Sequence, residues 1–377
     1  MILSTNFSNR SVAILAAILI CLTGCSAVND PVVRVTNESP GIENVLPIAV
    51  LPVYNLSGLP APLSEIRQSL INSLKKQGFN TLDDNVLERS LARHRIRHVG
   101  GTNSMTAAAL GKDAGAETVL ITSLELYSEI SPPKIALSSR LVSTGSSPSI
   151  LWMDGIGMAG DDSPGILGLG LIEDPRTLLK KAVGHLTASL AGHLTGQRDN
   201  VETPKKRRKF WPRVLYRSPV IASDMKYRVA VLPFFNLSQR KYAGEIIALH
   251  FVKQFGKLEN FDVIEPGVVR HSLLRHRIIM DDGLSLAHSD LIFSKLNADL
   301  ILTGKIMDYQ DYQGPGGKPK VDFSAQMIER KRRAVVWSSK SYNEGDDGVY
   351  FFDLGRVNTA HVMASEMVNH VVEMIVE

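Results

Sequence analysis

The stretch Ile48-Ala-Val-Leu-Pro-Val-Tyr-Asn-Leu-Ser57 returns later in the chain as Val229-Ala-Val-Leu-Pro-Phe-Phe-Asn-Leu-Ser238, with seven of ten positions identical at an offset of 181 residues. A second stretch, Ser90-Leu-Ala-Arg-His-Arg-Ile96, returns as Ser272-Leu-Leu-Arg-His-Arg-Ile278 at an offset of 182. Two matches at nearly the same offset indicate a tandem duplication. The repeated unit has about 150 residues, which is enough to bury a core of its own.

Each copy begins with a continuous apolar run, residues 48–52 and 229–233, which is typical of a strand buried on both faces. Apolar residues at three- and four-residue spacing then predict helices, including a long helix that closes each copy. The stretches 135–154 and 321–338 each indicate an antiparallel hairpin with a tryptophan at a corresponding place. The order βαβααβββα therefore predicts an α/β fold made of two tandem mixed-sheet domains.

The N-terminus has the features of a secretory signal. Arg10 is followed by the 11 apolar residues 12–22, a stretch too short for a membrane span, which needs about 20 residues. The segment ends in Leu-Thr-Gly-Cys25, which resembles a bacterial lipobox, so we expect Cys25 to carry a palmitate-type lipid anchor. Ser26 in the next position, by resemblance to lipoprotein sorting rules, indicates the outer membrane. Because Cys21 leaves with the signal, the mature chain would have no free thiol.

Composition excludes several classes of function. The 42 Lys and Arg nearly balance the 38 Asp and Glu, and a formal net charge of +4 is too small for a dedicated nucleic-acid binder. Two cysteines exclude a framework of several disulfides and a zinc centre held by four cysteines. The predicted organisation is a signal peptide (1–24), a polar tether (25–45), a first α/β domain (46–196), a basic linker (197–226) and a second α/β domain (227–377).

The repeated strand motif, at 48–57 and 229–238, opens a βαβαα unit and resembles the N-terminal domain of the TolB translocation protein. It is also similar to envelope lipoproteins that include the curli-secretion lipoprotein. The resemblance implies a docking module without a catalytic centre, so no functional residues are carried over. The curli-secretion relative is an oligomeric pore with two long amphipathic hairpins per subunit. Here the second hairpin is charged between Glu329 and Arg333, which departs from the pore pattern.

Three motifs resemble sites of catalysis or ligand binding, but each also has a structural explanation. Gly155-Ile-Gly-Met-Ala-Gly160 has the GxGxxG spacing of a phosphate-binding loop, but Asp161-Asp162 follows it instead of a helix. Adjacent aspartates beside glycine, which recur at Asp346-Asp347, are more typical of turns than of an acid–base pair. His94 and His98 lie four residues apart but lack the HExxH context of a metallohydrolase. The sequence predicts no catalytic, cofactor or metal site.

Two segments are candidate contact surfaces. The basic run in the linker, with the aromatic pair after it, suits anionic lipid headgroups or another anionic envelope polymer. Its alternative role is a solvated spacer between the domains. The apolar, glycine-rich loop before the first closing helix suits self-association or a partner, and its alternative is packing on its own domain. The residues are Lys205, Lys206, Arg207, Arg208, Lys209, Phe210 and Trp211 in the linker, and Gly165, Ile166, Leu167, Gly168, Leu169 and Gly170 in the loop.

These patterns together predict a lipid-anchored docking or assembly module of the bacterial envelope. It would face the periplasm from the outer membrane and bind envelope proteins, with no nucleic acid and no cofactor. One alternative is a homo-oligomeric subunit of a secretion or pore apparatus that associates through the glycine-rich loop. Another is an envelope hydrolase that uses Asp161 or Asp346, and we expect no such turnover.

Overall fold

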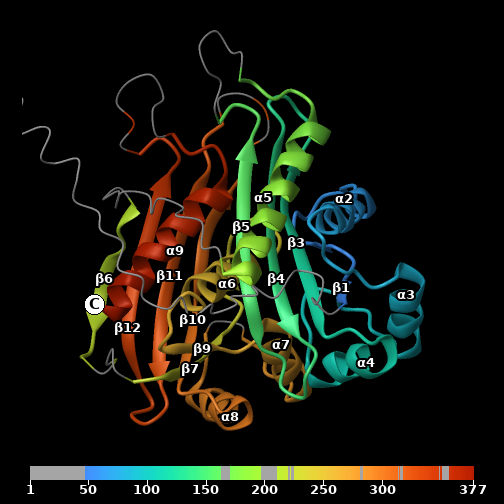
Figure 1. The fold of residues 1–377 in the computed structure, drawn as a ribbon. Helices are drawn as coiled ribbons and strands as arrows, with labels where there is room; N and C mark the ends of the chain where they lie inside the picture. Colours follow the sequence, from blue (N-terminus) through green and yellow to red (C-terminus); the bar gives the residue numbers. More distant parts are fainter. Residues whose placement is uncertain are drawn as a thin grey trace, which may run out of the picture. The chain divides into compact units, whose positions relative to one another are not determined.

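The first repeat forms a mixed sheet with the strand order β1-β3-β4-β5, and β2 pairs beside β3 (Figure 1). The strands are β1 (Ile48–Val50), β2 (Tyr54–Asn55), β3 (Thr118–Ser128), β4 (Lys134–Ser143) and β5 (Ile150–Ala159). The helices are α2 (Leu63–Lys76), α3 (Asp84–Arg93), α4 (Ser104–Ala114) and α5 (Pro175–Thr195). β1 and β2 run parallel to β3, whereas β3, β4 and β5 pair antiparallel.

The second repeat has the same core connectivity and two additional strands, β6 and β9, at the edges of its sheet. Its strands are β6 (Arg213–Arg217), β7 (Tyr227–Val231), β8 (Phe235–Asn236), β9 (Phe261–Val263), β10 (Leu300–Gln310), β11 (Lys320–Glu329) and β12 (Ala334–Glu344). Its helices are α6 (Ala243–Phe255), α7 (Pro266–Arg275), α8 (Leu286–Leu296) and α9 (Ala360–Val376). β7 and β8 run parallel to β10, and β10, β11 and β12 pair antiparallel, as in the first repeat. The predicted α/β fold with two mixed-sheet repeats is confirmed.

This computed structural model describes residues 47–162, 170–196, 210–219, 221, 225–280, 283–312, 314, 317–347, 349 and 356–377. The predicted signal peptide with Cys25, the tether, the basic run 205–209 and the loop residues 165–169 lie outside them. Within the described part, no helix has the length and apolar character needed to cross a membrane. Both repeats belong to one compact unit, Pro40–Glu377.

Part of the predicted linker is structured, and the prediction is wrong at this point. β6 pairs antiparallel with β12 and extends the second sheet. Phe210, just before it, is fully buried in the core of the second repeat. The physical reason is that β-branched and aromatic residues such as Val214 and Tyr216 suit a strand, and the edge of β12 offers unpaired backbone groups. Phe210 is therefore not available for contact with a membrane, whereas Trp211 is 39% exposed.

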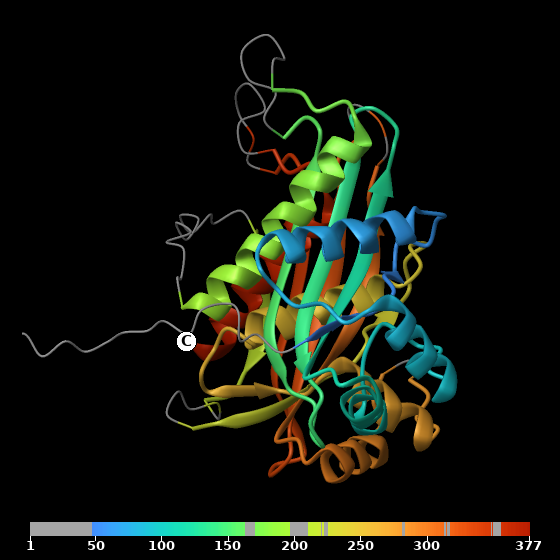
Figure 2. The same ribbon diagram turned by 45° about the vertical axis from the view of Figure 1, so that its right-hand side comes forward.

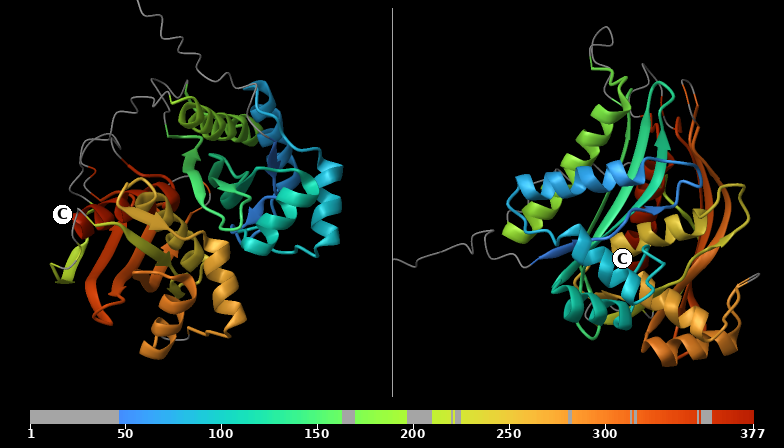
Figure 3. Two further views of the ribbon diagram at one scale, coloured as in Figure 1. Left: turned by 60° about the horizontal axis from the view of Figure 1, so that its bottom comes forward. Right: turned by 90° about the vertical axis from the view of Figure 1, so that its right-hand side faces the viewer.

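Helices cover the sheets in the same way in both repeats. One face of the first sheet packs on α2 and α5 through apolar side chains such as Leu70 and Trp152 (Figure 2). α3 and α4 cover one end of the opposite face. The second sheet packs on α6 and α9 in the same manner, and α7 and α8 cover one end of its opposite face. The rest of the opposite face of the first sheet is left for contact with the second repeat (Figure 3).

A β-bulge interrupts the third strand of each repeat at equivalent places. The register shifts between Leu124 and Leu126 in β3, and between Ile306 and Asp308 in β10. A bulge leaves one residue unpaired and changes the direction of its side chain. The unpaired residues are Glu125 in the first repeat and Met307 in the second, so a carboxylate and an apolar side chain occupy the same position.

Candidate functional site between the repeats

The second repeat covers polar groups on the first sheet. We name this surface the junction face; it carries Glu125, Lys134, Ser138, Arg140, Gly155 and Gly157. Lys134 is only 3% exposed, and its Nζ donates to the carbonyl oxygens of Tyr312 at 2.9 Å and Asn358 at 3.0 Å. Because both acceptors belong to the second repeat, this ammonium group links the two repeats directly.

A buried ion pair makes the second polar link. Arg140 donates to Glu265 Oε1 from Nε at 3.1 Å and from Nη2 at 2.8 Å, and the side chains are 1% and 0% exposed. The other oxygen of Glu265 accepts from the backbone N–H groups of Gly267 and Val268 and so caps α7. Arg140 Nη2 also donates to the carbonyl of Gly100 at 2.7 Å. Each charged group therefore has partners, which a buried pair requires.

Beside this ion pair, the two backbones meet without side chains between them. A Cβ on Gly101 would lie 2.7 Å from Gly267 Cα, and a Cβ on Gly267 would lie 2.3 Å from Thr102 N. These separations are shorter than van der Waals contact and involve backbone atoms, which cannot rotate away. Glycine is thus required on both sides of this contact.

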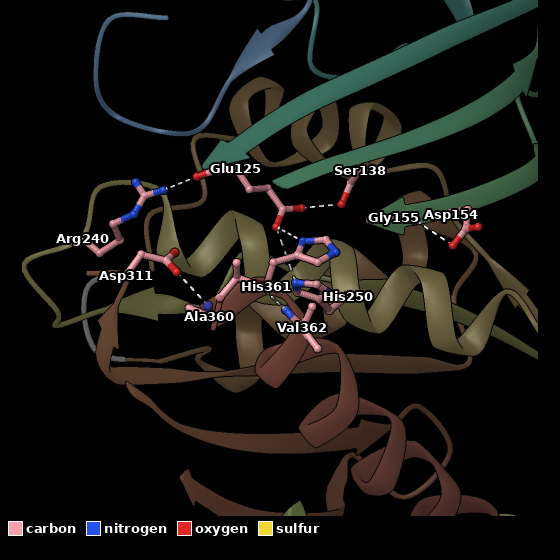
Figure 4. Close-up of polar contacts among 11 residues, drawn as sticks. Glu125, Ser138, Asp154, Gly155, Arg240, His250, Asp311, Ala360, His361 and Val362 are labelled. Atoms are coloured by element: carbon pink, nitrogen blue, oxygen red, sulfur yellow. Dashed lines mark hydrogen bonds and ion pairs between the residues drawn. The ribbon is translucent and has the colours of Figure 1, made fainter. Parts of the chain in front are cut away.

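The third polar link is a cluster of Glu125 on β3, His250 on α6 and His361 on α9 (Figure 4). Glu125 Oε2 lies 2.6 Å from His361 Nδ1 and 3.6 Å from His250 Nε2. The side chain of Ser138 donates to the other oxygen, Oε1. The three side chains are 1–3% exposed, and the two imidazole rings meet edge to face with centroids 4.7 Å apart.

The protonation of the cluster follows from burial and mutual charge. Burial opposes ionisation of Glu125, but the charge of His361 and then that of His250 hold its pKa well below the usual value. Burial lowers the pKa of His250 to about 4, against the attraction of the Glu125 carboxylate. Near neutral pH, Glu125 is therefore ionised and His250 is neutral.

The glycines of the GxGxxG stretch give His361 its position. Gly155 and Gly157 lie on β5 and face α9. A Cβ on Gly155 would lie 3.1 Å from His361 Cε1, and a Cβ on Gly157 would lie 3.0 Å from His361 Cδ2. The absence of side chains at these two positions thus makes space for the imidazole ring of the second repeat.

These three residues also have the arrangement of potential metal ligands. The carboxylate oxygen and the imidazole nitrogens of Glu125, His250 and His361 all lie within 4.8 Å of one another, and all three residues are buried. The sequence did not predict this group, since its members are far apart in the chain and no metal motif contains them. The only local signal was a carboxylate inside the apolar strand Thr118–Ser128.

The aspartates singled out in the sequence lie outside this cluster. Asp162 follows β5 and accepts from Ala159 N at 2.7 Å, and Asp347 follows β12 and accepts from Glu344 N at 2.9 Å. The neighbouring Asp346 pairs with Lys318. None of these aspartates lies in the buried cluster. Gly170, the described end of the glycine-rich loop, is exposed.

The repeated Arg-His-Arg element of the first repeat borders a cavity of about 370 Å³ between the repeats. His94 pairs with Asp113, and His98 makes an edge-to-face contact with Tyr54 at 5.1 Å. The basic residues that line the cavity come from both repeats, and its lining contains no carboxylate; they are His94, Arg95, Arg97, His98, Arg270 and His271.

No family model and no curated protein matches the chain. Similarity is found only to solved structures. The PelC dodecamer from Paraburkholderia phytofirmans aligns at 16% identity and TM-score 0.27, over 41% of this chain and 92% of that chain. Lipoprotein GNA1162 from Neisseria meningitidis aligns at 20% identity and TM-score 0.27, over 38% and 97%. The C-terminal domain of LpoB from Salmonella enterica aligns at 14% identity and TM-score 0.24, over 33% and 87%.

These alignments cover nearly all of each neighbour but less than half of this chain, so each neighbour is about as long as one repeat. Identities of 20% or less and TM-scores below 0.3 do not transfer an assembly or a partner to this chain. The resemblance to the TolB N-terminal domain and the curli-secretion lipoprotein is not confirmed and stays a prediction.

Proposed function

We propose that the chain is a lipid-anchored docking or assembly module on the periplasmic face of the bacterial outer membrane, that it binds envelope proteins, and that it catalyses no reaction. The observation that carries the location is the Leu-Thr-Gly-Cys25 sequence directly behind a short apolar segment. A cysteine in this context is the attachment point of a lipid, and a lipid confines the protein to a membrane surface.

The ionisable groups at the junction support a binding role. Arg140, Glu265 and Lys134 are at most 3% exposed, and each makes at least one contact with the other repeat. Groups in this environment hold two domains together. A reacting substrate needs access to such groups.

The edge of the second sheet is the surface best suited to a protein partner. β6 is the last strand in the order of the second sheet, so one side of its backbone is unpaired among the described strands. Leu215 and Tyr216 on β6 are 50% and 51% exposed, and Trp211 lies nearby. An extended peptide can pair with such an edge and place its side chains against exposed apolar groups.

The alternative is a homo-oligomeric subunit of a secretion or pore apparatus. The apolar residues 165–170 favour it, since an apolar loop suits contact between copies. Light scattering on the purified chain separates the two proposals, because a monomer removes this alternative.

The test combines anchoring and partner capture in intact envelopes. We expect Cys25→Ser to move the protein from the outer-membrane fraction to the soluble fraction. A photo-crosslinking amino acid at Leu215 should capture envelope proteins that mass spectrometry can identify. The matched control is the same crosslinker at Lys180, an exposed residue on α5. A Cys25→Ser protein that stays membrane-bound contradicts the anchor, and equal capture at both positions contradicts the β6 surface.

A further inference from the structure

The geometry points to a binding site for one divalent transition-metal ion, of the zinc type, formed by Glu125, His250 and His361 between the two repeats. This site is independent of the proposed docking function. It would join the strand that carries Glu125 to both helices of the second repeat that face it.

The donor atoms have the chemistry and spacing that zinc uses. Imidazole nitrogen and carboxylate oxygen bind Zn²⁺ at about 2.0–2.2 Å, which places neighbouring donors roughly 3.3 Å apart in a tetrahedral site. Glu125 Oε2 lies 3.6 Å from His250 Nε2 and 2.6 Å from His361 Nδ1. These two separations lie on either side of the tetrahedral value. A bound ion would replace the hydrogen bond between Glu125 and His361 and draw His250 inward.

One donor atom lacks a partner. His250 Nε2 is fully buried and makes no hydrogen bond, although it points toward Glu125. His250 is 2% exposed, and a buried ring nitrogen without a hydrogen bond costs free energy. Hydrogen bonding within the cluster satisfies Glu125 and His361 and leaves His250 unsatisfied. A metal ion satisfies all three.

The surrounding residues hold the donors in place. Ser138 donates to the Glu125 oxygen that faces away from His250, which fixes the carboxylate orientation. Gly155 and Gly157 lie against the His361 ring. Such contacts around the ligands orient them for a metal.

Charged groups of both signs surround the three ligands. Zn²⁺ with one carboxylate and two neutral imidazoles keeps one positive charge, which is unfavourable in a buried site. Asp311 accepts from Ala360 N at 2.7 Å, next to His361 in the sequence, and Figure 4 shows it beside Ala360 and Arg240. Burial raises the pKa of Asp311, and the positive charge of a bound ion would favour its ionised form. The cations Arg240 and Lys253 also lie close to the cluster and oppose the binding of a further positive charge.

The second repeat does not supply this donor set at equivalent positions. The bulge residue equivalent to Glu125 is Met307. The hairpin register pairs Ser138 with Gly155 in the first repeat and Ser324 with Lys340 in the second, so a lysine stands where Gly155 makes space for an imidazole. The metal ligands therefore occur where the two repeats meet, and one site per chain is expected.

The experiment measures zinc binding by the full purified chain after removal of metals with a chelator. Zn²⁺ is titrated in competition with a chromogenic chelator, and bound zinc is counted by mass spectrometry of the metal. We expect one zinc per chain. Glu125→Gln and His250→Gln should each weaken binding by more than about 100-fold, since ligand loss costs more than loss of a supporting contact. His185→Gln, at an exposed histidine on α5, is the matched control and should bind like the wild type.

Two further measurements keep the result decisive. Circular dichroism shows whether each variant is folded. The number of zinc ions bound by the wild-type chain tests the site even if a variant does not fold. Because the ligands are buried, the titration is repeated on chain refolded from urea with Zn²⁺ present. A wild-type chain that holds no zinc after refolding overturns the site. Zinc binding that both ligand variants retain at wild-type affinity overturns it as well.

Discussion

Gly157 shows how one residue type can have opposite effects in this fold. On β5 a Cβ at this position would lie 2.8 Å from Thr359 Oγ1 and 3.0 Å from His361 Cδ2, both of the second repeat. Gly184 lies inside α5, where a Cβ would meet no atom within 4 Å. The first glycine is needed for contact between repeats, and the second carries only the entropic cost of glycine in a helix.

We therefore expect Gly157→Ala and Gly184→Ala to change stability in opposite directions. Gly157→Ala should lower the free energy of unfolding by about 1–3 kcal/mol, as in other overpacked contacts. Gly184→Ala should raise it by about 0.5–1 kcal/mol, the difference in helix propensity. Urea denaturation of both variants checks this. Equal effects of the two substitutions would contradict the close contact at β5.

At the residue scale, the sequence predicted apolar cores well and the polar junction poorly. Trp152 and Trp337 were matched as equivalents, and both are buried. Glu125 was not recognised, because a single carboxylate in an apolar strand gives no information about its partners. Its partners His250 and His361 are 125 and 236 residues away in the chain. Only the fold brings these three together.

At the element scale, the two hairpins offer a comparison inside one molecule. Lys134 pairs with Ala159 at the start of the first hairpin, and Lys320 pairs with Glu344 at the start of the second. The two lysines are thus equivalent in register. Lys134 is buried and donates to carbonyls of the other repeat, whereas the side chain of Lys320 is 32% exposed and pairs with Asp308 at 3.1 Å.

Replacing each lysine by methionine separates the two environments. Lys134→Met should lower the free energy of unfolding by about 1–3 kcal/mol, since the carbonyls of Tyr312 and Asn358 lose their donor. Lys320→Met removes a partly exposed ion pair and should change stability by less than about 1 kcal/mol. Thermal denaturation of the two variants measures the difference. A Lys320→Met protein that is as unstable as Lys134→Met would contradict the assignment of Lys134 to the junction.

The order of helices and strands could be predicted from the spacing of apolar residues. The contacts between the two repeats could not. The long helices α5 and α9 close the two repeats as predicted, because their apolar spacing is regular. Two features escaped prediction for physical reasons. β6 is short and lies in a charged, proline-containing stretch, so its pattern is weak and only the free edge of β12 stabilises it. The predicted order βαβααβββα also has a strand after the first helix, and in the first repeat this part of the chain makes only an isolated bridge between Ile48 and Thr81.

At the scale of the whole molecule, the buried polar links join the stability of the two repeats. If the second repeat unfolded, Arg140 would lose Glu265 and Lys134 would lose its carbonyl acceptors. Each positive charge in the first repeat would then lack its partner. Breaking one partner of a buried pair costs about 3–5 kcal/mol. Unfolding one repeat would break these links together, so it also destabilises the other repeat.

We therefore expect both repeats to unfold in one cooperative transition. In differential scanning calorimetry of the full chain, the calorimetric enthalpy should equal the van't Hoff enthalpy, as for a two-state unit. Arg140→Met should lower the transition temperature and split the transition in two. Arg176→Met, at a pair with Glu65 whose side chains are 74% and 45% exposed, is the control and should leave it single. Two resolved transitions in the unmodified chain would contradict the coupling.

Lys340 and Tyr342 of the second hairpin stand where the first hairpin has the two glycines that face α9. Gly157 of the first hairpin pairs with Ala136, and its equivalent, Tyr342, pairs with Asp322 and is 53% exposed. α9 approaches the first sheet closely at Gly155 and Gly157. A helix that approached the second sheet at the equivalent place would meet the side chains of Lys340 and Tyr342. The two hairpins therefore present chemically different faces: the first offers two glycines to α9, and the second offers a lysine and a tyrosine to solvent.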